Sequence, residues 1–226
     1  MGGLKVYFDL LSQPARGVLL FLKANNIPYI ACPIALRKGE HFTPEFTKIN
    51  PLKRVPVIDH NGFHLTESVA ILKYLSREFC TPDHWYPQDS KLRARVDEFL
   101  AWQHLNLRLN GSMVFRTKVV VPKLTNTPVD ETKLNQFLKG LETDLQQLET
   151  VFLRNRPFLC GEKITIADLL GACEVEQPCA AGFDVLEDKP LVAAWIENVR
   201  NHLAPHYDEV HQVCRQVRDR VEKSKL

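Results

Sequence analysis

Two serines stand where helices are predicted to begin, and a hydroxyl group in that position can contact an anion. Ser12 follows a strand-like stretch and precedes Pro14 by two residues, while Ser68 directly follows Glu67 and opens an apolar periodic stretch. The first turn of a helix leaves backbone N–H groups free, and the helix dipole adds partial positive charge there. Such an end can bind a carboxylate or favour a sulfur anion. On position alone, each serine is also explained as an ordinary helix cap.

The spacing of the cysteines and the small net charge exclude metal, dithiol redox and nucleic-acid sites. None of the six cysteines forms a Cys-x-x-Cys pair, so we expect neither a metal site nor a dithiol redox motif. They are predicted to be buried free thiols: Cys32, Cys80, Cys160, Cys173, Cys179 and Cys214. The net charge of +2 is too small to indicate nucleic acid or an anionic membrane as a partner.

The sequence shows no sign of export or membrane insertion. No stretch reaches the roughly 20 apolar residues that a membrane span needs. The first residues lack the apolar core and the small-residue cleavage site of a signal peptide. We therefore expect a cytoplasmic protein that contacts no membrane.

The first 80 residues have the pattern of a small α/β domain. Strand patterns, either alternating or short and apolar, occur at 4–10, 29–36, 55–58 and 63–65. Helical spacing occurs at 14–25 and 68–79. Asn61-Gly62 between the last two strands is a strong hairpin signal. The order βαβ followed by ββα predicts a thioredoxin-like fold with parallel first strands.

The remainder of the chain is predicted to be all helical. Residues 81–89 contain two prolines and several turn formers and are predicted to be a linker. Apolar residues then recur every three or four positions through 91–118, 130–153, 166–177, 190–202 and 206–223. We thus predict a thioredoxin-like domain at 1–80, a linker at 81–89 and an all-helical domain at 90–226.

One helix of the second domain has a complete start signal. Thr165 is placed to cap it, with Asp168 three residues later as the second half of a capping box. Ile164 and Leu169 flank the box as a hydrophobic staple. A cap of this kind contributes about 1 kcal/mol, so this motif is expected to serve folding and to take no part in chemistry.

Several segments, in this order along nearly the whole chain, resemble the theta class of the cytosolic glutathione S-transferases, of the vertebrate type. They are 9–14 (DLLSQP), 38–41 (KGEH), 50–56 (NPLKRVP), 65–71 (LTESVAI), 81–87 (TPDHWYP) and 93–104 (RARVDEFLAWQH). The resemblance implies a transferase that needs no cofactor and uses glutathione as co-substrate.

By this resemblance Ser12 is the catalytic residue, and its hydroxyl donates to the glutathione sulfur. A free thiol has a pKa around 8.5, so little thiolate exists at neutral pH. Lowering that pKa by about two units needs roughly 2.7 kcal/mol. One hydrogen bond to a charged group contributes about 1.5–3 kcal/mol, so Ser12 can supply much of this. Tyr7 is a rival hydroxyl, but its alternating strand neighbours predict ordinary packing.

The resemblance also implies the residues that bind the peptide part of glutathione. Val55 would pair with the cysteinyl backbone, preceding Pro56 in the cis form. Ser68 would bind the γ-glutamyl carboxylate at its helix end, and Glu67 the ammonium group. Without the resemblance, Val55-Pro56 is explained as a plain strand start. Glu67-Ser68 is then explained as an N-cap with an acidic neighbour.

Cationic side chains complete the implied site. His41 and Arg54, with Lys53 beside it, would bind the glycine carboxylate, although each is also explained as a solvated surface residue. Arg108 matches a theta position that faces the electrophile and could stabilise a leaving anion, with a surface salt bridge as the alternative. Arg116 stands where theta relatives often have Trp, which changes the electrophile pocket.

The expected activity is attack of the glutathione thiolate on alkyl or aralkyl halides and epoxides, with reduction of organic hydroperoxides as a second activity. The alternative is a non-catalytic ligand-binding protein on the same fold. A glutaredoxin-type reductase would need Cys where Ser12 stands. Theta relatives usually continue into a segment that covers the active site, so the end at Leu226 predicts a more open pocket. The family forms two-fold homodimers, and we expect one here.

Overall fold

Within residues 3–223, which the computed structural model describes, four strands form one mixed sheet. The strands are β1 (Leu4–Phe8), β2 (Ile30–Pro33), β3 (Val57–His60) and β4 (Phe63–Thr66), in the order β2-β1-β3-β4. Val6 lies opposite Ala31 in the parallel pair β1–β2 and opposite Ile58 in the antiparallel pair β1–β3. The parallel first pair and the β3–β4 hairpin are both as predicted. Asn61 and Gly62 have φ values of 55° and 88° in the turn between them.

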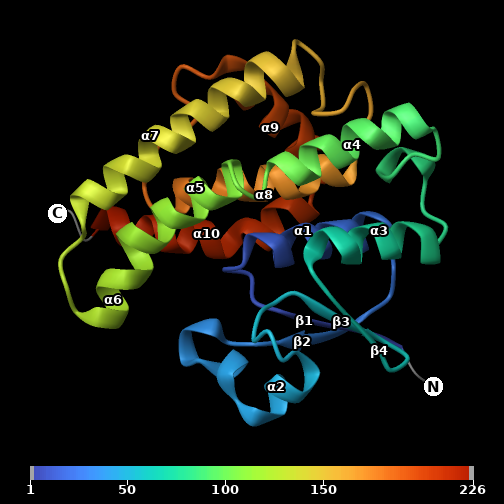
Figure 1. The fold of residues 1–226 in the computed structure, drawn as a ribbon, viewed down its shortest axis with the longest axis horizontal. Helices are drawn as coiled ribbons and strands as arrows, with labels where there is room; N and C mark the ends of the chain where they lie inside the picture. Colours follow the sequence, from blue (N-terminus) through green and yellow to red (C-terminus); the bar gives the residue numbers. More distant parts are fainter. Residues whose placement is uncertain (1–2, 224–226) are drawn as a thin grey trace.

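Helices cover both faces of this sheet. Helices α1 (Gln13–Ala24) and α3 (Ser68–Glu78) lie between the sheet and the rest of the helices, and α2 (Pro44–Ile49) lies on the opposite side (Figure 1). Sequence analysis did not predict α2, which is only 6 residues long. Phe46 of α2 packs edge-on against Tyr7, with ring centroids 6.2 Å apart. Tyr7 is therefore a packing residue of strand β1, as predicted.

The second domain contains only helices within the described residues. They are α4 (Ser90–Trp102), α5 (Leu107–Phe115), α6 (Val121–Thr125), α7 (Glu131–Gln147), α8 (Ile166–Ala180), α9 (Pro190–His202) and α10 (His206–Lys223). The two-domain fold class is thus confirmed. The ends of the predicted domains, residues 1, 2 and 224–226, and with them the end at Leu226, lie outside the described residues.

Two predicted helices differ from the observed ones. The stretch 91–118 is not one helix, because it breaks after Trp102 and resumes at Leu107. Asn106 has φ −118° and ψ −106°, and its side-chain amide donates to the carbonyl oxygen of Trp102 at 2.7 Å. An asparagine side chain that bonds the backbone in this way competes with the helical pattern. Beyond α5 and α7, the backbone continues as π-helical turns at Arg116–Val120 and Leu148–Leu153.

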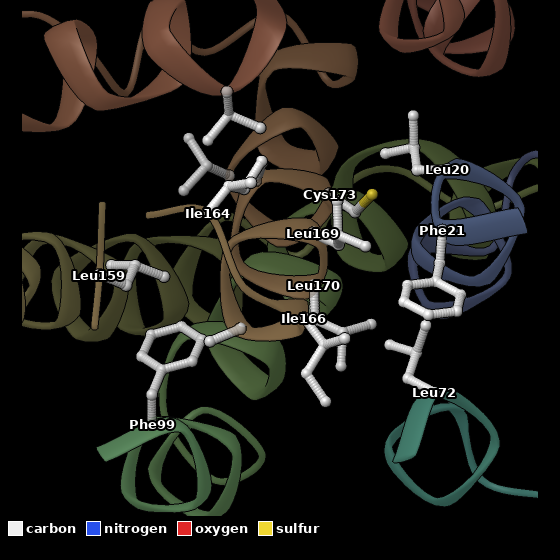
Figure 2. Close-up of a cluster of buried hydrophobic side chains, with 14 of the residues drawn as sticks. Leu20, Phe21, Leu72, Phe99, Leu159, Ile164, Ile166, Leu169, Leu170 and Cys173 are labelled. Atoms are coloured by element: carbon white, nitrogen blue, oxygen red, sulfur yellow. The ribbon is translucent and has the colours of Figure 1, made fainter. Parts of the chain in front are cut away.

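Helix α8 is the centre of the molecule and joins the two domains. Its side chains share one apolar core with those of α1, α3 and α4, as Figure 2 shows for Leu170, Phe21, Leu72 and Phe99. A Cβ atom at Gly17 would come within 2.7 Å of a Leu170 side-chain carbon, so glycine permits the close approach of α1 to α8.

The capping box at the start of α8 is confirmed. The Thr165 hydroxyl accepts from the N–H of Ala167, and the Asp168 carboxylate accepts from the N–H of Thr165 at 2.8 Å. Asp168 also accepts from the Leu159 N–H at 2.8 Å and from the Trp195 indole at 2.9 Å. The box therefore also ties α8 to the preceding loop and to α9.

The prediction that every cysteine is buried is wrong for half of them. All six are free thiols in the described part of the chain. Cys160, Cys173 and Cys214 are buried, whereas Cys32 and Cys179 are half-buried and Cys80 is exposed. Cys80 follows the end of α3, in the irregular segment before α4, where the chain runs over the surface. None of the helices within residues 3–223 has the length and apolar character required to cross a membrane.

Candidate functional site

Ser12 occupies the N-cap position of α1, yet its side chain makes no capping hydrogen bond. Its backbone is extended, with φ −86° and ψ 115°, and its carbonyl oxygen accepts the first helical bond, from Arg16 N–H at 3.1 Å. The hydroxyl instead donates to the carbonyl oxygen of Val55 at 3.4 Å. The residue is 8% exposed. The interpretation of this side chain as a helix cap is therefore wrong, and its hydroxyl is available to a ligand.

The turn that carries Ser12 is fixed from two sides. The carboxylate of Asp9 accepts from the N–H of Leu11 at 2.8 Å and from the N–H of Leu36 at 2.9 Å. On the other side, the guanidinium of Arg16 donates to the carbonyl oxygen of Leu10 at 2.8 Å. Sequence analysis did not single out Asp9 or Arg16. An aspartate just before a turn is a known turn former, so Asp9 could have been found from that signal.

Val55 and Pro56 bring the second segment to Ser12. Their peptide bond is cis, as predicted, and Val55 is buried. The loop before them is organised by Asn50, which is also buried. Its side chain donates to the carbonyl oxygen of Arg54 at 2.8 Å and accepts from the N–H of Leu52 at 2.9 Å. Asn50 was not predicted, because its role depends on the loop conformation.

Lys53 and Arg54 lie on this loop and are exposed. Lys53 has φ 55°, in the left-handed region that non-glycine residues seldom adopt. The structure therefore presents both cations to solvent beside the cis peptide bond.

Glu67 and Ser68 form the start of α3. Glu67 has φ 65° and ψ 110°, an unusual backbone conformation for a residue with a side chain. It is exposed and does not cap the helix, while Ser68 is buried at the first position of α3. The free N–H groups of this helix end thus lie beside an acidic side chain that is open to solvent. Such a pair suits a ligand that carries both a carboxylate and an ammonium group.

His41 lies in a short helical turn, Glu40–Phe42, and its ring contacts that of Phe42, with centroids 3.8 Å apart and the ring planes tilted by 41°. Its Nδ1 atom is buried and has no hydrogen-bond partner among residues 3–223. Burial lowers the pKa of His41, and the nearby carboxylate of Asp9 partly offsets this effect. The ring therefore lies near the turn that carries Ser12 and has an unused polar atom.

The two arginines predicted for the electrophile side differ in their surroundings. The guanidinium of Arg108 donates to the carboxylate of Glu174 at 3.2 Å, and that carboxylate is fully buried. The interpretation of this contact as a surface salt bridge is therefore wrong. Arg116 is exposed at the start of the π-helical turn after α5. Within residues 3–223 no hydrogen bond or ion pair joins it to Ser12 or to Arg108.

An apolar cluster of the helical domain lies against the residue before Ser12. Leu11 packs on side chains from the end of α5, the π-helical turn, the end of α8 and α10, namely Phe115, Val119, Ala180, Ala181, Cys214 and Val217. Sequence analysis missed this cluster, because its members come from segments that are far apart in the chain. It places apolar side chains of the second domain next to the serine turn.

The comparisons with known proteins agree with this geometry. A family model for the glutathione S-transferase N-terminal domain matches residues 4–77, and one for the C-terminal domain matches residues 113–202. The chain is 44% identical to mouse glutathione S-transferase theta-3 over 218 residues, which are 96% of this chain and 90% of that protein.

Two solved structures are similar in both sequence and fold. The apo form of human glutathione S-transferase T1-1 is 44% identical with a TM-score of 0.93, over 96% of this chain and 91% of that one. Human glutathione transferase theta-2, in complex with glutathione and an unknown ligand, is 39% identical with a TM-score of 0.94, over 99% of this chain and 92% of that one. The chain therefore belongs to the glutathione S-transferase family, and within it to the theta class. As a member of this family it is an enzyme, a transferase that acts with glutathione.

Proposed function

We propose that this transferase joins the glutathione thiolate to small hydrophobic electrophiles and that Ser12 is its catalytic residue. The preferred substrates in this proposal are alkyl and aralkyl halides and epoxides, with reduction of organic hydroperoxides as a further activity. The observation that carries the proposal is the hydroxyl of Ser12, which is buried and takes no part in capping α1. Among residues 3–223 it donates only to the Val55 carbonyl.

The chemistry needs a thiolate that is stable at neutral pH. The Ser12 hydroxyl exchanges its weak contact with Val55 for a bond to the sulfur anion, and a bond to a charged acceptor contributes about 1.5–3 kcal/mol. The N-terminal end of α1 adds favourable potential. The thiolate then attacks the carbon, the new S–C bond forms, and the bond to the leaving group breaks with its electron pair. Holding the two reactants together supplies further acceleration.

The peptide part of glutathione is placed by the segments around Ser12. In the proposal the Val55 backbone pairs with the cysteinyl unit, Ser68 and its helix end bind the γ-glutamyl carboxylate, and Glu67 binds the ammonium group. The exposure of Glu67 beside the buried Ser68 supports this assignment. The theta-2 structure contains glutathione, which supports the same use of this fold.

The glycine carboxylate is assigned to His41, Lys53 and Arg54. The unpartnered Nδ1 of His41 and the exposed cations of the loop before Val55 support this assignment. The electrophile is placed against the apolar cluster next to Leu11. Arg108, which lies about two turns before Phe115 of that cluster on α5, stabilises the leaving anion in the proposal. Arg116 adds an exposed cation at the other end of α5, next to Phe115 of the cluster.

The assembly and the location are part of the proposal. We place the domain boundary at 81–89 and expect a homodimer in which the N-terminal domain of one subunit contacts the helical domain of the other. Large apolar side chains are exposed on both domains, including Leu52 and Phe63 on the first and Leu92 and Leu105 on the second. Sedimentation as a single chain of 25.9 kDa would contradict the dimer. We assign the protein to the cytoplasm.

The test of the function is the pair Ser12→Ala and Ser12→Thr, assayed with a halide, an epoxide and an organic hydroperoxide. Loss of about 1.5–3 kcal/mol of thiolate stabilisation corresponds to a fall in kcat of about 10- to 150-fold in the alanine variant. The threonine variant keeps a hydroxyl and should keep more activity. Glutathione binding, measured by calorimetry, should change little in both. Wild-type turnover by Ser12→Ala on all three substrates would refute the assignment.

A further inference from the structure

Glu174 is a fully buried carboxylate at the point where three helices meet. It belongs to α8, and its Oε1 atom accepts from Nη1 of Arg108 on α5 at 3.2 Å. Its Oε2 atom is buried as well and has no hydrogen-bond partner among the described residues. Gln13 and Arg16 of α1, the helix that begins directly after Ser12, also act on this carboxylate. The carboxylate thus lies between the helix of the serine and the helix of the arginine.

Helix α5 reaches this carboxylate because it approaches α8 closely. A Cβ atom at Gly111 would come within 3.2 Å of the carbonyl oxygen of Glu174, which is tighter than ordinary packing. Arg108 lies three residues before Gly111 and therefore on the same face of α5. The glycine contact fixes the distance between the two helices, and that distance brings the guanidinium to the carboxylate.

The charges around Glu174 partly compensate for its burial. Burial raises the pKa of Glu174 to about 7, while the positive charges of Arg108 and Arg16 and a contact from the Gln13 side chain act in the opposite direction. Arg16 is itself buried and donates to Gln177 at 2.8 Å and to the carbonyl oxygen of Cys173 at 3.0 Å.

Further titratable groups lie around these two arginines. His104 precedes α5 and interacts with the charge of Arg108, while Glu176 on α8 and His211 on α10 interact with that of Arg16. Any dependence on pH that is assigned to Glu174 must therefore be separated from the titration of these side chains.

Fold stability does not account for a carboxylate at this position. A buried ion pair can often be replaced by neutral groups of similar size with no loss of stability or with a gain. The ion pair does, however, restrict the position of the Arg108 guanidinium. Its side chain is 29% exposed, and a guanidinium has five N–H donors, of which the bond to Glu174 occupies one. The pair anchors one side of the guanidinium, and its other N–H groups have no hydrogen-bond partner within the part of the chain that the structure describes.

We propose that Glu174 is a positioning residue, which holds the guanidinium of Arg108 so that its free N–H groups face the departing anion of the electrophile. This inference rests on the proposed function of Arg108. As the S–C bond forms, the electron pair of the breaking bond moves onto the leaving group, and Arg108 donates hydrogen bonds to that anion. Neither Arg108 nor Glu174 gains or loses a proton in the step.

The test measures how turnover depends on the leaving group. A series of benzyl substrates with leaving groups of graded basicity is assayed at about pH 8, above the raised pKa of Glu174, so that its carboxylate is ionised. The wild type, Glu174→Gln, Arg108→Gln and the double variant are compared. For the poorest leaving group we expect kcat to fall at least about tenfold in each single variant, and much less for the best one. The double variant should lose no more than Arg108→Gln alone, because both changes remove the same interaction. The absorbance titration of the bound thiolate should stay unchanged.

A matched control comes from the other side of α5. Asn110 donates to the buried carboxylate of Asp144 on α7 at 2.7 Å, so Asp144→Asn also alters a buried carboxylate that contacts α5. This variant can change the melting temperature. The slope of log kcat against the pKa of the leaving group should stay at its wild-type value. Should Glu174→Gln not fold, Glu174→Asp keeps the charge and withdraws it from Arg108, and it should steepen the dependence in the same way.

The results of these assays distinguish a failure of the role of Arg108 from a failure of the role of Glu174. A wild-type slope in Arg108→Gln would overturn the role of Arg108 and, with it, that of Glu174, whereas the Ser12 variants test the transferase chemistry independently. A steeper slope in Arg108→Gln together with a wild-type slope in both Glu174 variants would overturn the inference on Glu174 alone. Independent losses that add in the double variant would also overturn it.

Discussion

The hydroxyl oxygen of Ser12 lies 3.4 Å from the carbonyl oxygen of Val55, and this contact joins the turn before α1 to the loop before β3. A bond of this length is weak, so the hydroxyl can turn to a better acceptor at small cost. A thiolate is such an acceptor, because hydrogen bonds to ionised groups are shorter and stronger than those to neutral ones. Since the side chain does not cap α1, using it for a ligand takes nothing from the helix.

Ser12→Ala is expected to raise the pKa of the glutathione thiol in the bound complex. The lost bond to the anion, about 1.5–3 kcal/mol, corresponds to an increase of roughly one to two pKa units. The ultraviolet absorbance of the thiolate, followed against pH with saturating glutathione, measures this value. Ser12→Thr should remain close to the wild type. An equal thiol pKa in the alanine variant and the wild type would show that another group stabilises the sulfur.

His41 is expected to make the binding of glutathione analogues depend on pH. Burial lowers the pKa of His41 in the free protein, and a bound carboxylate would raise it again. The complex therefore binds a proton more readily than the free protein, and affinity should increase as pH falls from about 8 to about 6. S-methylglutathione is the suitable probe, because it has no thiol to ionise.

The control for this prediction is His41→Gln, which keeps a hydrogen-bond donor but cannot become charged. It should bind the probe more weakly at low pH, and its affinity should be almost constant over the same range. If the pH dependence persisted unchanged in His41→Gln, the histidine would not contact the ligand carboxylate.

The sequence allowed much of the fold and part of the site to be predicted. Local signals placed the strands, the Asn61-Gly62 turn and the Thr165–Asp168 box, because each depends on neighbouring residues and on simple periodicity. The break at Asn106 was not predicted, since it depends on its side chain donating to the carbonyl oxygen of Trp102, four residues earlier.

The contacts between segments far apart in the chain could not be predicted from the sequence. Arg108 and Glu174 are 66 residues apart in the chain, and their contact depends on how α5 approaches α8 at Gly111. In the sequence Glu174 is one acidic residue on a helix, and nothing local indicates that it is buried. The left-handed conformation of Glu67 likewise has no sequence signal, because it arises from the way β4 meets α3.

Arg16→Met is expected to affect both stability and turnover. It removes the donor to the Leu10 carbonyl oxygen, which fixes the serine turn, and it takes one donor each from the Cys173 carbonyl oxygen and the Gln177 side-chain oxygen inside the protein. Taking the donor from a buried acceptor costs about 1–3 kcal/mol per group in the free energy of unfolding. The looser turn should also lower kcat at least about tenfold at temperatures where the variant is fully folded.

Urea denaturation and steady-state assays on the same samples measure the two effects of Arg16→Met. Lys23→Met is the control, because it removes a cation from the same helix whose partner, Glu209, is at the surface. Such an exposed pair contributes at most about 1 kcal/mol, and kcat should not change. A loss of stability in Arg16→Met with unchanged kcat would show that the turn keeps its geometry without the arginine.

Glu174→Gln is expected to change how stability depends on pH. Burial raises the pKa of Glu174 from its ordinary value of 4.5 to about 7, so between these values the folded protein holds a proton that the unfolded chain has lost. The contribution of this group to the free energy of unfolding therefore falls as pH rises through that window. The difference in pKa corresponds to on the order of 3 kcal/mol. Relative to the wild type, the variant should gain up to this amount between about pH 5 and about pH 8, measured by urea denaturation at each pH. A difference between the two proteins that stayed constant with pH would show that the carboxylate is ionised throughout, held in that form by Arg108 and Arg16.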